Sequence, residues 1–222
     1  MTSPAAVGAT RPRAILFDWD NTLIDSWETI HEALVTTFRA MGHEPWSMAE
    51  TKERVRLSLR DQFPRLFGER WETARDLYLD TFRRIHLDRL KPVTGAAELL
   101  GELAAAGLYL AVVSNKTGAI LRREAEHLGW TGHFKRLVGA GDAARDKPQA
   151  APVLLALDGT GIACAEAWYV GDTGLDMECA ANSGCVGVLL GARDASDAGL
   201  AQFPPTLHFP GFAALGRHLA GS

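Results

Sequence analysis

AILFDWDNT, at residues 14–22, is the stretch that determines how this chain folds. Four apolar residues are followed at once by two acids, which is typical of a buried parallel strand that ends at the edge of a sheet. Side chains alternate along a strand, so Asp18 and Asp20 are expected on one side and Trp19 on the other. Two carboxylates this close repel each other unless a cation or a shared proton intervenes. The stretch therefore indicates a metal site, although an acidic strand end by itself is more often a solvated turn.

Three other fragments stand where a predicted strand ends or a helix begins. Ser114-Asn115 follows the apolar run at 109–113, and Lys147 precedes Pro148 and an amphipathic helical pattern. The fragment GDTGLD, at residues 171–176, follows the apolar run at 167–170. Ligands of an open parallel α/β sheet bind outside the carboxyl ends of its strands. We therefore expect all four fragments to meet at one edge of the sheet.

Each of these residue types suits one task in phosphoryl transfer. Asp18 can attack phosphorus in line and form an aspartyl-phosphate, which divides a difficult hydrolysis into two easier steps. Asp20 can protonate the leaving oxygen and then deprotonate the incoming water. Ser114 and Lys147 can bind the phosphoryl oxygens, over which negative charge is spread in the transition state. Asp172 and Asp18 offer the hard oxygen ligands that Mg²⁺ prefers, so Mg²⁺ is the expected cofactor.

Several of these residues also have plainer explanations. Ser114 could cap the N-terminus of a helix, and Asp176 could bind the amides of its own loop. A helix dipole disfavours Lys147 just before a helix, so an anionic ligand beside it would help to explain its presence. The seven histidines are scattered and none pairs with a candidate nucleophile, so all are expected to be structural. The three cysteines lack the paired spacing of a zinc site and are expected to be reduced thiols.

Together the four fragments resemble the motifs of the haloacid dehalogenase-like hydrolases, in the family's order and over residues 13–191. Within this family the chain looks most like the phosphoglycolate phosphatase branch, because of the stretches TGHF at 131–134, VGAGD at 138–142 and KP at 147–148. The resemblance implies a Mg²⁺-dependent phosphatase that acts on a small phosphorylated metabolite such as phosphoglycolate. The matching motifs are Asp18-x-Asp20-x-Thr22, Ser114-Asn115-Lys116, Lys147-Pro148 and Gly171-Asp172-Thr173-x-x-Asp176.

The resemblance also implies roles for particular residues. Asp18 would be the nucleophile and Asp20 the acid/base, and Asn115 would contact the substrate. The metal residues would be Asp18, Asp20, Asp172 and Asp176, the last of them acting behind the direct ligands.

Two features depart from the family pattern. Asn21 stands where most members carry glycine, but asparagine tolerates left-handed backbone angles better than most residues. Residues 55–60 lack the glycines that the phosphoglycolate branch usually carries. This difference weakens the assignment of phosphoglycolate as the substrate but does not affect the expected reaction.

The helix and strand patterns divide the chain into two units. Residues 26–91 show only helical periodicity, with helix starts indicated at Asp25-Ser26 followed by Glu28, and at Ser47 followed by Glu50. From Thr94 onward, helices alternate with short strands, which is typical of a mostly parallel sheet. We expect an α/β fold with a Rossmann-like core at 13–25 and 92–222 and an inserted all-helical cap at 26–91. The expected later strands lie near 109–113, 136–138, 167–170, 186–189 and 207–209.

Three arginines lie at the expected inner edge of this cap: Arg54, Arg56 and Arg60. Arginine is suited to bidentate capture of a carboxylate or a second phosphate. Exposed arginine is commonplace, so a solvated helix face is the alternative. We expect at least one of the three, and Arg60 first, to contact the substrate.

Composition and charge exclude several other classes of protein. The chain has 222 residues, of which 47% are hydrophobic, and a net charge of −4. This charge gives no reason to expect nucleic acid or an anionic membrane as a partner. No apolar stretch approaches the length of a transmembrane helix, and residues 1–12 suggest a flexible lead-in without a signal-peptide core. We expect a cytoplasmic protein, either a monomer or a homodimer.

Other functions remain open at this point. The ester could be a nucleotide or a sugar phosphate, and a phosphomutase would differ only in passing the phosphoryl group to a second sugar. A hydrolytic dehalogenase of the same fold would need neither a metal nor an acid at position 20, so Asp20 argues against it. A catalytically silent interaction protein would have no physical reason to keep repelling carboxylates together.

Overall fold

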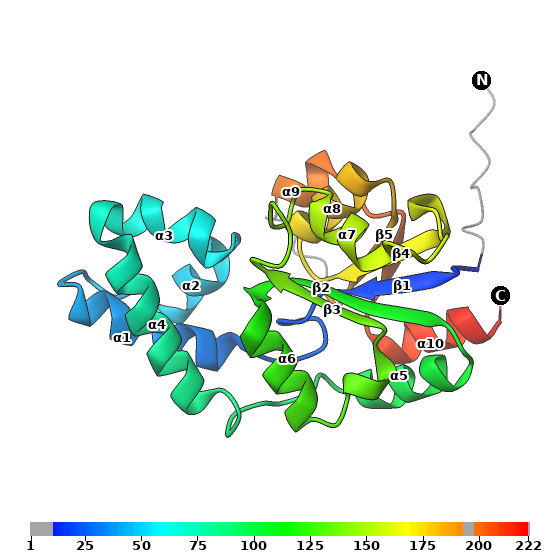
Figure 1. The fold of residues 1–222 in the computed structure, drawn as a ribbon, viewed down its shortest axis with the longest axis horizontal. Helices are drawn as coiled ribbons and strands as arrows, with labels where there is room; N and C mark the ends of the chain where they lie inside the picture. The colour runs from blue at the N-terminus through cyan, green and yellow to red at the C-terminus, as the bar shows by residue number, and fades with distance from the viewer. Residues whose placement is uncertain (1–10, 193–197, 222) are drawn as a thin grey trace.

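The fold is built around a six-stranded parallel sheet (Figure 1). The computed structural model describes residues 11–192 and 198–221. The strands lie in the order β3-β2-β1-β4-β5-β6, so the order reverses beside β1, where an α/β sheet usually binds its ligand. They are β1 (Ala14–Phe17), β2 (Tyr109–Thr117), β3 (Arg136–Ala140), β4 (Ala167–Gly171), β5 (Val186–Leu190) and β6 (Leu207–Phe209).

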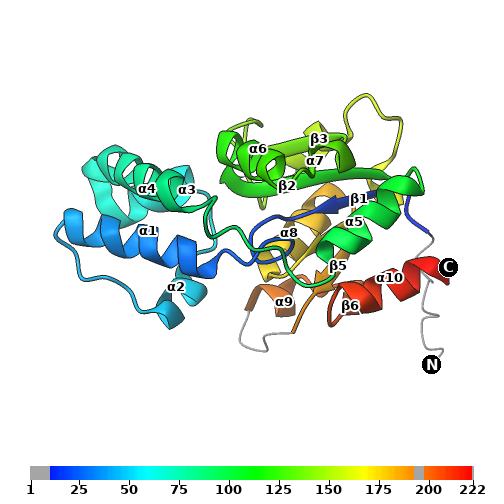
Figure 2. The same ribbon diagram turned by 90° about the horizontal axis from the view of Figure 1, so that it is seen from below.

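Helices cover both faces of the sheet (Figure 2). The face that carries Ile15 and Phe17 is covered by α5 (Ala96–Ala105), α6 (Gly118–His127) and α10 (Phe212–Ala220). The face that carries Ala14 and Leu16 is covered by α7 (Ala151–Leu157) and α8 (Gly174–Ser183), with α9 (Ala198–Gln202) beside α8. Because β1 is buried on both faces, its four residues are all apolar.

The segment between β1 and α5 forms a separate cluster of helices beyond the carboxyl ends of the strands (Figure 1). It contains α1 (Trp27–Ala40), α2 (Met48–Arg54), α3 (Leu59–Phe67) and α4 (Trp71–Ile85), with a 3₁₀ turn at Gly68–Arg70. The apolar stripes of α1, α3 and α4 meet in one cluster that includes Phe38, Phe63 and Phe82. Two further 3₁₀ turns, Thr131–His133 and Cys164–Glu166, belong to the sheet unit.

The predicted fold class is confirmed: a parallel sheet between helical layers carries an inserted set of helices. Every expected strand is present, but β2 continues four residues further than expected, to Thr117, with an irregular register against β3. The start predicted at Ser47 is a capping box with Glu50, whereas the Ser26 side chain makes no capping bond to α1. The lead-in expected at 1–12 lies, for residues 1–10, outside the described residues.

The turn after β1 explains how asparagine replaces glycine there. Asn21 has a left-handed backbone with φ of 63°, as expected for a turn that glycine usually fills. Its side-chain oxygen also accepts a hydrogen bond from the Ser26 amide at 3.2 Å. The turn therefore keeps its shape and gains a bond that glycine could not make.

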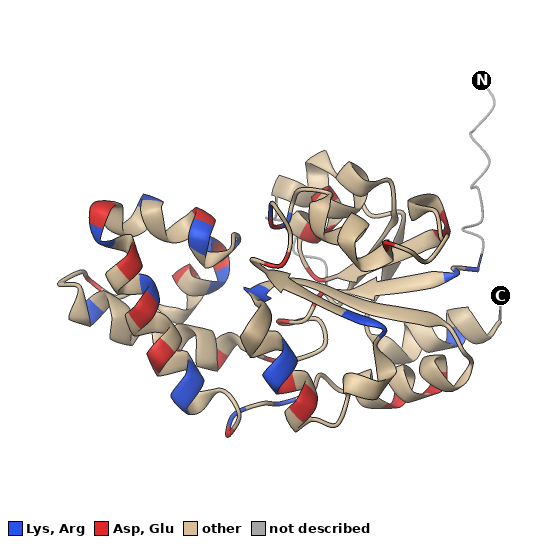
Figure 3. Ribbon diagram, viewed as in Figure 1, with Lys and Arg blue, Asp and Glu red and all other residues tan. Residues whose placement is uncertain are grey.

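Charges of both signs are interspersed along α3, α4 and α6 (Figure 3). An anionic ligand would therefore depend on charges within the site rather than on a strongly basic helix face. Among the described residues, no helix has both the length and the apolar character needed to cross a bilayer.

Candidate active site

A pocket lies between the ends of the central strands and the inserted helices. The structure brings all four sequence fragments together there, as the sequence predicts. The sheet unit contributes Asp18, Asp20, Ser114, Asn115, Lys116, Lys147, Asp172 and Asp176. The inserted helices contribute a mostly apolar wall of Trp27, Ile30, Val55, Leu57, Leu59, Tyr78, Leu79 and Phe82, together with Arg56.

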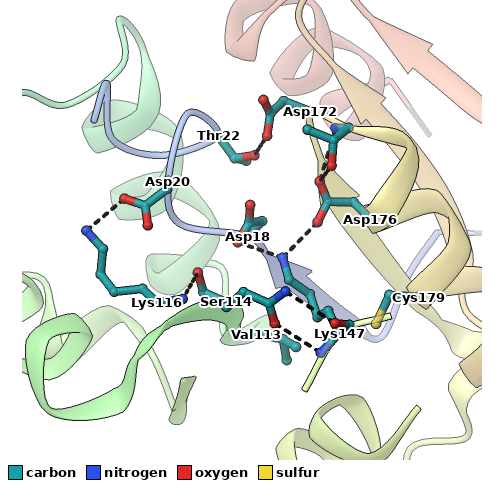
Figure 4. A network of polar contacts seen from close by, with 12 residues as sticks. Asp18, Asp20, Thr22, Val113, Ser114, Lys116, Lys147, Asp172, Asp176 and Cys179 are labelled. Carbon is teal, nitrogen blue, oxygen red and sulfur yellow. Dashed lines mark hydrogen bonds and ion pairs between the residues drawn. The ribbon is translucent and has the colours of Figure 1, made fainter. Parts of the chain in front are cut away.

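Asp18 and Lys147 form the centre of the site (Figure 4). Lys147 Nζ lies 2.8 Å from Asp18 Oδ1 and 2.8 Å from Asp176 Oδ1. Only 2% of the Lys147 side chain is exposed, so both ion pairs form away from bulk water. Asp18 follows β1, Lys147 lies between β3 and α7, and Asp176 lies in the first turn of α8.

Three carboxylates share this centre with a single lysine. Oxygens of Asp18, Asp172 and Asp176 lie within 4.8 Å of one another, close enough to bind one cation. Thr22 Oγ1 donates a hydrogen bond to Asp172 Oδ1 at 3.0 Å, which fixes that carboxylate in the cluster. Three negative charges against one ammonium leave an excess that a divalent cation would balance, and carboxylates are ligands that Mg²⁺ prefers. The donor set therefore fits Mg²⁺.

The pKa values reflect this crowding. Burial raises the pKa of Asp18 to about 6, and Asp176 adds to the rise while Lys147 opposes it. Burial and the negative charges of Asp176 and Asp18 raise the pKa of Asp172 well above its usual range. Burial lowers the pKa of the Lys147 ammonium, but Asp176 and Asp18 more than compensate and hold it well above its ordinary value. Lys147 is therefore a permanent cation in this site.

Asp176 already uses both of its oxygens within the protein. Its Oδ2 accepts hydrogen bonds from the Thr173 amide at 3.0 Å and the Thr173 hydroxyl at 2.7 Å, which caps α8. Its Oδ1 accepts from Lys147. A Cβ at position 171 would overlap the Asp176 carboxyl group, so glycine is required there. This arrangement fits the supporting role expected for Asp176 and leaves Asp18 and Asp172 to face a cation.

Ser114 and Asn115 lie within β2 rather than at a helix start. The N-cap residue of α6 is Thr117, so the alternative of Ser114 as a helix cap is wrong. The Asn115 side chain binds both polar backbone atoms of Lys147: its Nδ2 donates to the carbonyl at 3.2 Å and its Oδ1 accepts from the amide at 3.0 Å. Asn115 therefore holds Lys147 in place, and its contact with substrate stays a prediction.

Asp20 turns away from the three-carboxylate cluster. Its Oδ1 lies 2.7 Å from Lys116 Nζ, and its carboxylate is not part of the cluster found among the described residues (Figure 4). Because the Asp20 carboxylate lies outside the cluster whose oxygens are close enough to share one cation, the arrangement does not support the expected metal role of the Asp20 side chain. Its position at the pocket, two residues after Asp18, leaves the acid/base role open.

The three arginines of the inserted helices have different surroundings. Arg60 forms an ion pair with Asp146, at 2.5 Å from Nε to Oδ2, and is not among the residues that line the pocket. Arg54 pairs with Glu50 at 2.9 Å on the surface of α2. Arg56 lines the pocket, and its Nε donates to the Glu53 carbonyl at 2.9 Å. The structure thus places Arg56, rather than Arg60, where a substrate would lie.

Sequence reasoning missed two residues beside the site, Glu124 and His86, and gave no role to a third, Lys116, which it named only as part of a motif. Lys116 Nζ binds both Asp20 and Glu124, and His86 Nδ1 lies 2.8 Å from Glu124 Oε1. Alternation along the strand that contains Ser114 could have revealed Lys116, since residues two apart share a side. No sequence signal links His86 to Glu124, because 38 residues separate them.

Comparison with known proteins agrees with this geometry. A family model described as haloacid dehalogenase-like hydrolase matches residues 15–189. The chain is 31% identical over 176 residues to a phosphoglycolate phosphatase of Aquifex aeolicus, covering 78% of this chain and 81% of that protein. It is 30% identical over 217 residues to a phosphoglycolate phosphatase of Rhodospirillum rubrum, covering 92% and 90% of the two chains.

Solved structures agree on the fold. A haloacid dehalogenase-like hydrolase of Bacteroides fragilis superposes with a TM-score of 0.84 at 20% identity, over 92% of this chain and 99% of that one. An identity this low bears on the fold alone, whereas the family match spans most of the chain. The chain belongs to the haloacid dehalogenase-like hydrolases, in the branch that resembles the phosphoglycolate phosphatases.

Proposed function

We propose that this protein is a Mg²⁺-dependent phosphatase that hydrolyses a small phosphorylated metabolite through an aspartyl-phosphate on Asp18. One observation carries the proposal: the Asp18 carboxylate is clustered with Asp172 and Asp176 and bound by Lys147 at the base of a pocket. The names of the relatives support the reaction class. A cytoplasmic location and a monomeric or homodimeric state stay predictions.

In the first half-reaction, Asp18 is the nucleophile. One of its oxygens forms a bond to phosphorus while the bond from phosphorus to the leaving oxygen breaks. The Asp20 carboxyl donates its proton to that oxygen, so that an alcohol leaves rather than an alkoxide. Lys147 and the Ser114 hydroxyl bind the phosphoryl oxygens, where charge accumulates in the transition state. Bound between Asp18 and Asp172, Mg²⁺ would supply the positive charge that reduces repulsion between the nucleophile and the phosphate.

In the second half-reaction, the Asp20 carboxylate accepts a proton from water. The hydroxide oxygen bonds to phosphorus, the bond to Asp18 breaks, and inorganic phosphate is released. One carboxyl group thus serves both proton transfers, because the first leaves it ready for the second. A phosphomutase would require a second sugar in place of this water.

We assign residues 26–91 the role of a cap over residues 13–25 and 92–222. The two connections between these parts lie side by side, since the Asp25 amide donates to the Lys91 carbonyl at 2.8 Å and the Val93 amide to the Leu23 carbonyl at 2.9 Å. Paired connections of this kind let one unit move against the other as a body. Closure would exclude water from the phosphoryl group.

Phosphoglycolate is the first candidate substrate, and Arg56 is the pocket residue suited to its carboxylate. The otherwise apolar wall favours a second candidate, a phosphate ester with a larger carbon skeleton. Kinetics with 2-phosphoglycolate, sugar phosphates, nucleoside monophosphates and aryl phosphates would separate the two. A higher kcat/KM for 2-phosphoglycolate that falls with Arg56→Met supports the first.

The proposed function itself is tested with p-nitrophenyl phosphate. We expect hydrolysis with Mg²⁺, loss of hydrolysis with EDTA and recovery when Mg²⁺ is restored. Hydrolysis that is unaffected by EDTA, or none with any ester of the panel, would contradict the proposal.

A further inference from the structure

A second group of charged side chains lies beside the catalytic carboxylates. Lys116 Nζ lies 2.7 Å from Asp20 Oδ1, and 3.0 Å and 2.9 Å from the two oxygens of Glu124. The Lys116 side chain is 4% exposed and that of Glu124 is fully buried. Lys116 thus connects the proposed acid/base to a carboxylate that lies outside the pocket lining.

Glu124 is held from two further directions. Its Oε2 accepts a hydrogen bond from Trp19 Nε1 at 2.7 Å, and its Oε1 lies 2.8 Å from His86 Nδ1. Trp19 separates Asp18 from Asp20 in the chain, and its ring packs edge-on against Trp130 and Phe134. Each Glu124 oxygen therefore has two partners, which leaves the carboxylate little freedom to move.

The Lys116 side chain is also held in one position by its contacts. Besides its two carboxylate partners, its Nζ lies 4.6 Å from the centre of the Phe82 ring on α4. Burial lowers the pKa of Lys116, but Asp20 and Glu124 more than compensate, so the lysine stays charged. Burial raises the pKa of Glu124, but Lys116, His86 and Trp19 hold it below its usual range. Lys116 and Glu124 together are therefore a neutral, rigid ion pair.

Stability alone does not explain such a pair. Removing two charges from water is costly, and well-packed apolar residues of similar volume are often as stable as a buried ion pair. What the ion pair adds is a positive charge at a fixed point beside Asp20. The Lys116 ammonium lies against Asp20 Oδ1 and disfavours a proton there, so the proton that moves in the reaction is left on Oδ2.

We propose that Lys116 and Glu124 are positioning residues for Asp20, Lys116 by binding its Oδ1 and Glu124 by holding Lys116. The inference rests on the proposed function, because it assigns these residues to the proton transfers of the phosphatase reaction. Proton donation from Oδ2 matters most when the leaving oxygen would otherwise depart as an unstable alkoxide.

The test compares two esters that differ in this need. Glycerol 2-phosphate releases an aliphatic alcohol, whereas p-nitrophenyl phosphate releases a stabilised phenolate that needs little protonation. The ratio kcat/KM reports the first half-reaction, in which the leaving group departs. The variants are Lys116→Met, Glu124→Gln and the double variant. The double variant removes both members of the buried ion pair, so it keeps the test valid if either single variant folds poorly. Glu126→Gln, on the exposed side of the same helix, is the matched control.

We expect Lys116→Met and the double variant to lower kcat/KM for glycerol 2-phosphate by roughly 30-fold or more, and for p-nitrophenyl phosphate by less than about 5-fold. Glu124→Gln should also lower kcat/KM more for glycerol 2-phosphate than for p-nitrophenyl phosphate, but by less than Lys116→Met does. Glu126→Gln should match the wild type on both esters. In an Asp20→Asn background, Lys116→Met should add less than about 3-fold, because the two residues act as one unit.

Two outcomes would overturn the inference in distinguishable ways. Equal losses on the two esters, or no loss on either, in an active and folded double variant would overturn the positioning role and leave the phosphatase intact. A wild-type protein that hydrolyses neither ester with Mg²⁺ would overturn the proposed function, and the positioning role with it.

Discussion

Asp18 shows most clearly how the site departs from what stability alone would select. It is 7% exposed, and the raised pKa of about 6 means that its ionised form is disfavoured in the folded protein. Lys147 offsets only part of this cost, because its ammonium is shared with Asp176. A carboxylate whose ionised form is disfavoured in this way is common where a protein keeps a nucleophile ready for reaction.

Asp18→Asn should therefore abolish activity without loss of stability. We expect turnover to fall by at least about a thousandfold, since amide nitrogen and oxygen cannot replace the attacking carboxylate. In EDTA at neutral pH, the melting temperature should stay equal or rise, because one of three crowded negative charges is removed. Thermal unfolding by circular dichroism measures this. A clear fall in melting temperature would mean that Asp18 mainly stabilises the fold.

The same carboxyl group predicts a pH dependence. Its pKa rises from the ordinary 3.8 to about 6 on folding, so the unfolded chain ionises first as the pH increases. Metal-free wild type should lose stability relative to Asp18→Asn between about pH 4 and pH 6, and the difference should then level off at no more than about 3 kcal/mol. Urea unfolding of both proteins across this range provides the measurement. A difference that grows toward lower pH would reverse the sign and contradict this account.

At the scale of elements, the sequence predicted most where a pattern is local. The apolar run at 14–17 and the alternation of helices and strands after Thr94 depend on neighbouring residues, and both predictions are confirmed. The capping box at Ser47 needs only Glu50 three residues on, so it too could be found. The helix start at Ser26 has its amide bound by Asn21 and no side-chain capping bond, which the local pattern could not reveal.

The contact between α3 and the loop before α7 could not be predicted in this way. Arg60 and Asp146 lie 86 residues apart, yet they form an ion pair whose carboxylate side chain is 1% exposed. Asp146 directly precedes Lys147, so the pair ties the inserted helices to the loop that carries this lysine. The sequence suggested a substrate contact for Arg60 because an arginine in a sequence indicates which kinds of group it can bind. It does not indicate which group the side chain contacts in the folded protein.

Arg60→Met should therefore act on stability more than on substrate binding. Loss of its partner leaves the buried Asp146 carboxylate bound by the Gly141 amide, and we expect about 1–3 kcal/mol less free energy of unfolding. KM should stay within about twofold of the wild type. Arg65→Met, at an exposed position of the same helix, should change stability by less than about 0.5 kcal/mol. A raised KM at unchanged stability would restore Arg60 as a substrate residue.

At the scale of the whole molecule, the site depends on parts of the chain that meet only on folding. The sequence predicted which edge of the sheet would gather the four fragments, because the carboxyl ends of parallel strands must lie together. It placed Asp172 with Asp18, but it could not predict that Asp20 turns to Lys116, since this choice depends on side-chain packing between the turn after β1 and β2. Nor could it identify the apolar wall that the inserted helices place over the site.

Because the carboxylate cluster joins β1 to the start of α8, metal binding should stabilise the entire fold. We expect Mg²⁺ to raise the melting temperature of the EDTA-treated protein, by an amount that corresponds to about 2.7 kcal/mol at a hundred times its Kd. Asp172→Asn should remove most of this effect, whereas Glu126→Gln should keep it. An identical melting temperature with and without Mg²⁺ would contradict the metal site.

The central claim is that Asp18 attacks phosphorus with a cation beside it, and one crystal structure tests it most directly. The protein would be crystallised with Mg²⁺ and beryllium fluoride, which mimics a phosphoryl group attached to a carboxylate. We predict beryllium bonded to an Asp18 oxygen, Lys147 in contact with a fluoride, and Mg²⁺ between Asp18 and Asp172. A beryllium adduct on another residue, or Mg²⁺ bound away from these two carboxylates, would contradict the account.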